Sequence, residues 1–398
     1  MITIIDEKED YIIKINEIYK VLIKYRDRNE VSLMSGNSGI ALFYVFYAAL
    51  VDEKEPIEYA NKLINNCFED INNGFSNISF AGGISGFAWF LNFLMKNRFL
   101  DEEDFGFDGL YQYFYNSMMA YMKNGNYDYL HGALGVSLYL LNSKSLTKKR
   151  NAIIDLIEAL ERNGIEDFND IKWISVIGET KQKVYNLSMS HGIASIISVL
   201  SKIYNSGIEK EKTKRLIYKA IGFLLSNKNT DYKHSIFPNY IHLNNSVSMK
   251  SRLAWCYGDL GIGMALLNSS IKLNDSELRE SAVNILLHSA VRRDMKSNMV
   301  VDAGLCHGTA GIGHAFNKAY QYTNNKVFRE TSRYWFSKTI ELGHLSDGLA
   351  GYKTWRGPEY GGWQNDYSFL TGISGIGLSL ISAISDIQPS WDECLLLS

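Results

Sequence analysis

The 398-residue chain is predicted to be an all-α protein, an α/α toroid of seven inner and seven outer helices with a small β-containing insertion. Two observations predict this fold. A glycine-led motif recurs seven times, and amphipathic helical patterns lie between its copies. The run after each glycine is apolar nearly all round, as expected of a helix buried on every side. Helices that are apolar all round alternate with helices that are apolar on one face only. This alternation favours an inner ring of helices inside an outer ring.

The repeated motif is a glycine, two intervening residues and a second small residue, followed by about a dozen mostly apolar residues. Successive copies lie 47 to 66 residues apart, which leaves room for two helices and two loops in each repeat. Ser195 replaces the second glycine in the fourth copy. The copies begin at Gly36, Gly83, Gly132, Gly192, Gly258, Gly308 and Gly372.

The expected outer helices show one apolar stripe each. Pro56 suits the first turn of one of them, and Gly164 closes another. Because the repeats use the whole chain, residues 1–398 are predicted to form a single toroid domain. The expected outer helices cover residues 9–26, 56–71, 104–122, 146–163, 209–227, 276–292 and 325–341.

Two segments lack helical periodicity. Residues 165–190 contain a β-like run at Ile171–Ile177, and we expect them to form a β-containing insertion at the rim that contacts substrate. Residues 228–250 include His234, Tyr240 and His242. Their role stays open.

Two short peptides carry the candidate metal ligands. Cys256 lies in Trp-Cys-Tyr-Gly, and Cys306 and His307 lie in Cys-His-Gly. Each peptide ends at a motif glycine, so neighbouring inner helices would bring the three side chains to one rim. Three protein ligands with a fourth position open to water or substrate are typical of catalytic zinc. The rival interpretation is that both cysteines are small buried hydrophobes, as free cysteines often are.

Composition excludes several classes of function. The net charge of −2 gives no electrostatic basis for binding nucleic acid or an anionic membrane. The first residues include a short acidic stretch, whereas a signal peptide would be basic and then apolar. No apolar stretch reaches the ~18 residues that a membrane-spanning helix needs. With two of the four cysteines assigned to metal, no disulfide framework remains. We therefore expect a cytoplasmic protein.

These motifs resemble the lanthionine cyclase (LanC-like) family over the whole chain, in the manner of its stand-alone lantibiotic cyclases. The resemblance rests on the seven glycine motifs, Trp255–Gly258, Cys306–Gly308, Ser190–Gly192 and the closing segment Trp391–Ser398. It implies a double ring of α-helices with one catalytic Zn²⁺, held by Cys256, Cys306 and His307. It also implies that His191 and Asp128 form an acid/base pair, that Arg252 lies near the metal, and that residues 165–190 match a β-rich extension known in the family.

The expected reaction is closure of thioether rings in a lantibiotic precursor peptide. Zinc with two thiolate ligands and one imidazole would keep a substrate cysteine as thiolate. This sulfur would add to dehydroalanine or dehydrobutyrine in the same peptide, a Michael addition. His191 would transfer the proton and Asp128 would orient its imidazole.

Each site residue has an alternative role. His191 could be a capping or core histidine, Asp128 a helix cap, and Arg252 a rim salt bridge. His131 also precedes a motif glycine and is a further candidate for the mouth of the toroid. We expect His314 to be internal and Cys67 and Cys394 to be inert.

Two other classes of function stay open. One is another zinc-thiolate S-alkylation, either glutathione addition to dehydroamino acids or prenyl transfer. The other is a non-catalytic, zinc-containing toroid that binds peptides. For the cyclase, the expected partners are a dehydrated precursor peptide with its leader, a separate dehydratase and an exporter. These partners would hold the protein at the membrane periphery.

Overall fold

The computed structural model describes residues 4–25, 30–100, 108–178, 181–230, 233–243, 250–385 and 390–398. The chain is divided into two compact units. Unit 1 comprises Met1–Asn77, Ala81–Phe90 and Arg293–Trp391, and unit 2 comprises Ile78–Phe80, Leu91–Arg292 and Asp392–Ser398. The prediction of a single domain over residues 1–398 stays a prediction.

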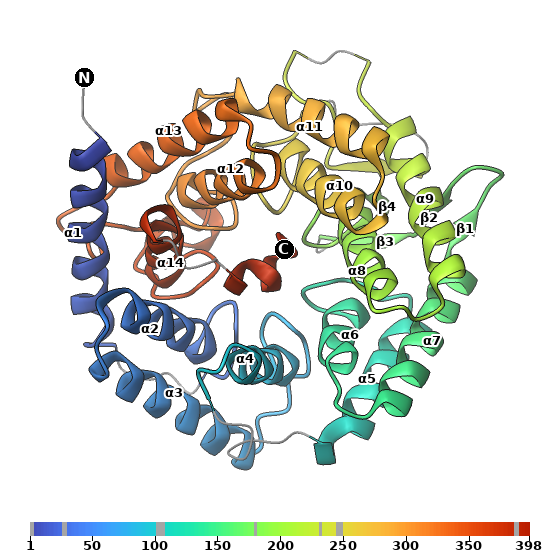
Figure 1. The fold of residues 1–398 in the computed structure, drawn as a ribbon, viewed down its shortest axis with the longest axis horizontal. Helices are drawn as coiled ribbons and strands as arrows, with labels where there is room; N and C mark the ends of the chain where they lie inside the picture. Colours follow the sequence, from blue (N-terminus) through green and yellow to red (C-terminus); the bar gives the residue numbers. More distant parts are fainter. Residues whose placement is uncertain are drawn as a thin grey trace. The chain divides into compact units, whose positions relative to one another are not determined.

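In unit 1, three helices that follow motif glycines pack side by side, and each is covered by a second helix (Figure 1). The glycine-led helices are α12 (Thr309–Thr323), α14 (Ile373–Ile384) and α2 (Asn37–Val51). Their covering helices are, in the same order, α13 (Lys326–Leu342), α1 (Ile4–Leu22) and α3 (Glu55–Asn72). Because α1 covers α14, segments from both ends of the sequence share this unit.

Unit 1 also contains a short hairpin before α14. Its strands are β6 (Thr354–Trp355) and β7 (Trp363–Gln364), with the 3-10 helix η2 (Pro358–Tyr360) between them. A further glycine-led helix, α4 (Ile84–Lys96), begins in unit 1 and ends in unit 2.

Unit 2 repeats the two-layer arrangement. The glycine-led helices α6 (Ala133–Leu141), α8 (Ile193–Asn205) and α10 (Asp259–Leu273) pack side by side. The helices α5 (Tyr111–Lys123) and α7 (Leu146–Asn163) cover α6, α9 (Lys210–Ser226) covers α8, and α11 (Ser276–Ala290) covers α10. The 3-10 helix η1 (Asp108–Leu110) precedes α5, and η3 (Ser390–Leu395) follows α14.

Burial separates the two kinds of helix as predicted. Every residue of α6 is buried, whereas α7 buries one stripe and exposes its charged face. Side-chain caps begin several covering helices: Ser145 accepts from Lys148 N at 3.4 Å, and Asp275 accepts from Leu278 N at 2.9 Å. The predicted outer helices match α1, α3, α5, α7, α9, α11 and α13 to within about five residues, with residue 26 of the first range and 104–107 of the third outside the described residues.

The two non-helical segments of unit 2 come together in one sheet. Strand β3 (Ser175–Ile177) pairs with β4 (Gln182–Asn186), and β4 pairs with β5 (Tyr240–His242), all antiparallel. A separate ladder joins β1 (Ile165–Glu166) to β2 (Ile171–Lys172). The β structure predicted for residues 165–190 is therefore confirmed, and the segment whose role was open supplies the third strand of the sheet. Residues 179–180, 231–232 and 244–249 of these segments lie outside the described residues.

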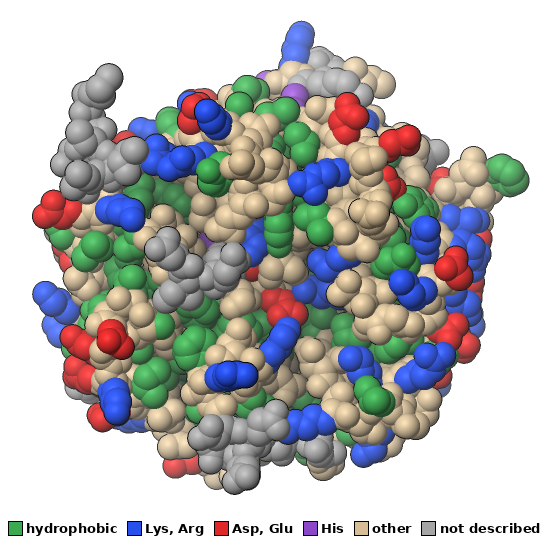
Figure 2. Space-filling model, viewed as in Figure 1, with side chains coloured by type: hydrophobic (Ala, Val, Ile, Leu, Met, Phe, Trp, Pro, Cys, Tyr) green, Lys and Arg blue, Asp and Glu red, His purple; other side chains and the backbone are tan. Residues whose placement is uncertain are grey.

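The described surface is mixed in charge. Lys and Arg side chains are interspersed with Asp and Glu over the face shown in Figure 2, in keeping with the net charge of −2. Among the described residues, no helix is both long enough and apolar enough to cross a bilayer.

Candidate functional site

A seven-residue segment leads into each glycine-led helix and ends at the motif glycine. We call these segments entry loops. A side chain on the glycine, the seventh position, would collide with the backbone carbonyl of the first position, for example Asn186 for Gly192 and Asp302 for Gly308. In most of these segments the residue after the glycine also donates to that carbonyl, as Thr309 N does to Asp302 O at 3.0 Å. The entry loops are residues 30–36, 77–83, 126–132, 186–192, 252–258, 302–308 and 366–372.

The second small residue of the motif is required for a similar reason. A side chain at Gly135, Gly261 or Gly311 would collide with the carbonyl oxygen six residues earlier. Ser195, the exception in the fourth repeat, donates its hydroxyl to Gly192 O at 2.7 Å. Close packing of backbone on backbone therefore accounts for both glycines of the repeat.

Side chains inside the entry loops fold them in the same way. At the first position, Asn126, Asn186, Asp302 and Asp366 each accept a hydrogen bond from the backbone N–H of the third position, at 2.8 to 3.2 Å. At the third position, Ser32 and Ser188 each accept from the N–H of the sixth, both at 3.0 Å. The sixth position, directly before the glycine, is held in place by this bond.

Asp128 occupies the third position of its entry loop, where Ser32 and Ser188 stand in theirs. One carboxylate oxygen, Oδ1, accepts from His131 N at 2.8 Å, as the serines do. The other oxygen, Oδ2, lies 2.7 Å from Nδ1 of His191, the sixth residue of the next entry loop. Asp128 thus caps its own loop and also contacts the predicted catalytic histidine.

The pair is partly shielded from solvent, with His191 29% and Asp128 21% exposed. Burial alone would lower the pKa of His191, but the hydrogen bond and charge of Asp128, with a further contribution from Cys256, raise it. Burial likewise opposes ionisation of Asp128, yet its bonds to His191 and His131 lower its pKa. Both shifts favour an imidazolium beside a carboxylate.

Three rings line up at the sixth position in unit 2. His131 stacks on His191 with centroids 5.9 Å apart and ring planes 17° apart, and the Tyr257 ring lies 6.2 Å from His191. Burial lowers the pKa of His131 and favours its neutral imidazole, whereas the pKa of the neighbouring His191 is raised. Tyr257 was not singled out from the sequence. Its alignment with the three histidines of the repeat is the signal that could have found it.

Cys256 is the fifth residue of its entry loop and is buried. Its carbonyl accepts from Met189 N at 3.1 Å and Ser190 N at 3.3 Å, so the loop that carries Cys256 is joined by backbone bonds to the loop that carries His191. The acid/base pair and one predicted metal ligand therefore lie together in unit 2.

Cys306 and His307 occupy the fifth and sixth positions of their entry loop in unit 1. Both are half-buried. Cys306 N donates to Leu370 O at 2.9 Å, Leu370 N to Met34 O at 2.9 Å, and Met34 N to Ala81 O at 3.0 Å. All four residues are fifth positions, so a line of backbone hydrogen bonds joins successive entry loops within the unit.

Cys256, Cys306 and His307 are together a group that could hold a metal ion. The donor types fit zinc, which binds cysteine sulfur and histidine nitrogen, and a set of three leaves a coordination position for another ligand.

The remaining candidates have defined positions. Arg252 takes the first position of its entry loop, where most loops have Asn or Asp, and its carbonyl lies against Gly258. His314 is buried and stacks on Trp391 with centroids 4.5 Å apart, so it is internal as expected. Cys67 and Cys394 are buried too, and burial raises the pKa of the Cys394 thiol.

A cavity of about 370 Å³ opens beside the acid/base pair. Its lining includes Asp128, His131 and His191 together with Ser175 and Val176 of strand β3. The β insertion is fastened there, because Tyr127, next to Asp128, donates its hydroxyl to Ile174 O at 2.8 Å. The insertion therefore forms one wall of the candidate active site.

Sequence reasoning missed one buried charged group. Asp259, fully buried at the start of α10, accepts from Ile236 N and Phe237 N at 2.9 Å each and from Arg292 Nη1 at 3.0 Å. Arg292 also donates to Ser251 O at 2.8 Å. This network holds the chain just before the Cys256 loop. Its partners come from three distant segments, so no local pattern marks it.

Comparison with known proteins agrees with these features. The model of the family described as lanthionine synthetase C-like protein matches residues 27–396. The nisin biosynthesis protein NisC of Lactococcus lactis subsp. lactis is 24% identical over 402 residues, covering 93% of this chain and 90% of that protein. The solved structure of a nisin cyclase superposes with a TM-score of 0.76 at 21% identity, covering 96% of this chain and 97% of that chain.

The structural match confirms the predicted fold class, the α/α toroid of this family. The match to the family model confirms the resemblance drawn from the glycine motifs and the predicted enzyme class. The chain belongs to the lanthionine synthetase C-like protein family.

Proposed function

We propose that this protein is a zinc-dependent lanthionine cyclase, which closes thioether rings in a dehydrated lantibiotic precursor peptide. Membership of the family over residues 27–396 supports the reaction class. The observation that carries the proposal is the 2.7 Å contact between His191 and Asp128, in a cavity of the unit that also holds Cys256. A half-buried imidazole with a raised pKa, held by a carboxylate, is suited to proton transfer.

The metal ligands in this proposal are Cys256, Cys306 and His307. When bound, zinc supplies positive charge that keeps a substrate cysteine ionised as thiolate at neutral pH. The backbone of each entry loop carries the ligand side chains. Main-chain hydrogen bonds fix the backbone of Cys256 and Cys306 at the fifth position of their loops, which supports their assignment as ligands.

The proton follows a path set by His191. Its Nδ1 faces Asp128, which leaves Nε2 for the substrate. The cysteine sulfur forms a bond to the β-carbon of the dehydroamino acid, and the π electrons move toward the carbonyl to give an enolate. The imidazolium donates its Nε2 proton to the α-carbon, and the proton lost by the thiol restores it. The reaction is an isomerisation and needs no co-reactant.

Asp128 serves as a positioning residue. Its carboxylate fixes the tautomer and orientation of the His191 ring and stabilises the charged form. Arg252 is not the Asn or Asp that forms the turn at the first position of most entry loops. We propose that it lies beside the metal and the reacting enolate.

The proposal also defines the partners. Dehydroamino acids must be made from serine and threonine before this reaction, and we propose that a separate dehydratase supplies them. We propose a cytoplasmic enzyme that meets the precursor, with its leader, in a complex with the dehydratase and exporter at the membrane periphery.

Mass spectrometry tests the proposal against its alternatives. The purified protein is incubated with dehydrated nisin precursor, chosen because the matched relative is a nisin cyclase, and then with N-ethylmaleimide. Ring closure leaves the peptide mass unchanged and blocks labelling of the cysteine. Added glutathione or an isoprenoid diphosphate would give a heavier product if the alternative alkylations were correct. The cyclase proposal would be contradicted if the zinc-loaded protein left the peptide mass unchanged before labelling and N-ethylmaleimide then labelled every cysteine of the peptide.

A further inference from the structure

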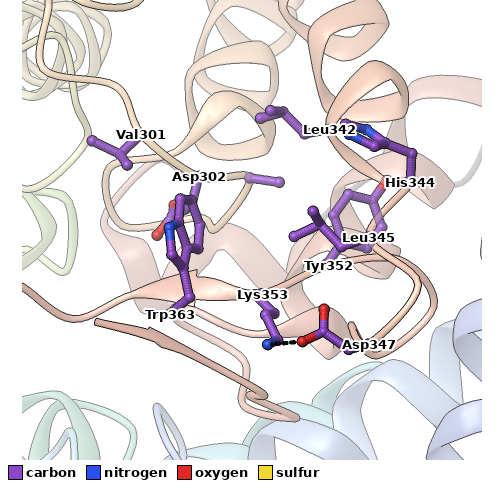
Figure 3. A pocket seen from close by; sticks show the side chains of 10 residues that line it. Val301, Asp302, Leu342, His344, Leu345, Asp347, Tyr352, Lys353 and Trp363 are labelled. Atoms are coloured by element: carbon purple, nitrogen blue, oxygen red, sulfur yellow. Dashed lines mark hydrogen bonds and ion pairs between the residues drawn. The ribbon is translucent and has the colours of Figure 1, made fainter. Parts of the chain in front are cut away.

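Unit 1 has a cavity of about 440 Å³ beside the entry loop that carries Cys306 and His307 (Figure 3). Its walls come from the start of that loop, from the end of α13 with the segment after it, and from β7. The lining residues are Val301, Asp302, Ala303, Leu342, His344, Leu345, Asp347, Tyr352, Lys353 and Trp363.

The walls of this cavity are mainly apolar. Two large apolar side chains on it are solvent-exposed, Val301 at 40% and Trp363 at 43%. The charged lining residues are already matched, since Lys353 pairs with Asp347 and Asp302 accepts from two backbone N–H groups. An apolar occupant would bury these walls without displacing the Lys353–Asp347 ion pair or the two hydrogen bonds to Asp302, so it would leave no buried polar group unpaired.

The cavity is fastened to the metal-ligand loop. Asp302, the first residue of the entry loop, accepts from Trp355 N of β6 at 2.9 Å through Oδ2. Arg356, which follows β6, bonds Asp366 of the neighbouring entry loop at 2.5 Å. The β6–β7 hairpin that carries Trp363 is thus tied to two entry loops. A group bound in the cavity is held at a fixed place relative to Cys306 and His307.

We propose that this cavity binds a large apolar side chain, aromatic or branched aliphatic, of the peptide substrate, at a residue outside the ring that is being closed. The inference rests on the proposed function and adds a specificity site to it. Ligand pockets typically span ~300–1,000 Å³, so this cavity suits one or two side chains. Burial of one such side chain strengthens binding on the order of tenfold to a hundredfold.

A filling substitution tests the site. Val301→Phe places a ring in the cavity, and Val327→Phe is its matched control, because Val327 is 39% exposed on α13 and does not line the cavity. The substrates are synthetic peptides with one dehydroalanine, one cysteine and a flanking leucine moved along the sequence, each paired with a glycine version.

For one leucine position, the wild type and Val327→Phe should show a KM about tenfold lower than for the glycine version, with little change in kcat. Val301→Phe should abolish this preference and leave the melting temperature unchanged. A preference that is absent from the wild type, or that persists in Val301→Phe, would overturn the proposal while the cyclase activity stands.

Binding without reaction is the second measurement. Peptides with serine in place of dehydroalanine cannot cyclise, and Trp363 reports their binding through its fluorescence. The leucine peptide should shift the emission to the blue in the wild type, with no such shift in Trp363→Phe. If this shift occurs in a protein that closes no ring, the cavity proposal stands and the proposed function fails. If Trp363→Phe shifts as the wild type does, the cavity proposal is wrong.

Discussion

Entry loops 186–192 and 302–308 are built alike but carry different chemistry. Both end in His-Gly, and in both a first-position side chain accepts from the third N–H, at 3.0 Å for Asn186 and 3.1 Å for Asp302. They differ at the fifth position, which is Ser190 in one and Cys306 in the other. They also differ in what faces the histidine, since Asp128 of the preceding loop lies 2.7 Å from His191.

The comparison shows that the backbone presents an imidazole in the same manner each time. The residue before the histidine and the side chains of the neighbouring loop then decide the role of the imidazole. In the loop with a cysteine beside the histidine, the pair suits metal binding. In the loop with a carboxylate opposite the histidine, the imidazole suits proton transfer.

The largest effect should come from removing the cysteine that distinguishes the two loops. Cys306→Ala, and likewise Cys256→Ala, should lose most of the zinc and nearly all ring closure, whereas Ser190→Ala at the same loop position should keep its zinc. Elemental analysis of purified protein measures this. Circular dichroism should stay helical, because a chain of this size has a core independent of the metal. Full zinc content in both cysteine variants would exclude the proposed ligand set.

The same substitution in both histidines should split metal binding from catalysis. His191→Asn should keep zinc and peptide binding and lose ~10²–10⁴-fold in ring-closure rate, the contribution of a positioned acid or base. His307→Asn should instead lose zinc. The rates come from peptide labelling followed by mass spectrometry. A wild-type rate in His191→Asn would move the proton transfer to another group, with His131 the first to test.

Asp128 can be separated into its two roles by using the serine of the other loops. Asp128→Ser should keep the cap on His131 N but slow ring closure about tenfold to a hundredfold. Asp128→Ala should show the same slowing and lose a further ~1 kcal/mol of stability, because the cap goes too. Equal stability of the two variants would argue against the capping role.

The pH dependence should follow the same residue. Since Asp128 raises the pKa of His191, Asp128→Ser should lower it, as followed by NMR of the imidazole in a pH titration. In the wild type, the pair's stabilisation is fully present below the unfolded-state pKa of histidine, near 6.5, and is lost as pH rises through the raised folded value. At the acid end it is lost as pH falls through the lowered pKa of Asp128. An unchanged His191 pKa in Asp128→Ser would contradict the pairing.

Arg252 should give the smallest effect. Arg252→Asn restores the side chain that other loops use at the first position, so we expect stability to rise by up to ~1 kcal/mol. Ring closure should slow by no more than about tenfold, with zinc retained. A thermal melt and the labelling assay measure the two changes. A variant that is both less stable and fully active would show that Arg252 is structural.

Much of this molecule could be predicted because its repeats are local patterns. The apolar stripe of α7 and the all-round apolar run of α6 can be read from consecutive residues, and Gly164 marks the end of α7. The metal-ligand candidates could be proposed because cysteine and histidine are rare here and fall beside motif glycines.

The rest depends on contacts between segments far apart in sequence. The carbonyl that requires Gly192 and the serine hydroxyl that holds His191 lie within one loop, but only the structure reveals the bonds. Sheet pairing of Val184 with His242 crosses 58 residues and joins two segments that looked unrelated. Asp128 stands at a position where two other loops have serine, and this becomes visible only when the loops are aligned by their hydrogen bonds.

Because main-chain atoms and small side chains set the shape of the entry loops, their sixth position is left open to change. In unit 1 it holds Ser35, Gly82, His307 and Thr371 on loops that end alike. A mutation there alters the functional group without refolding the segment that presents it. In evolution, as in protein design, such a scaffold allows new chemistry to be sampled by single substitutions, while the glycines that preserve the loop tolerate almost none.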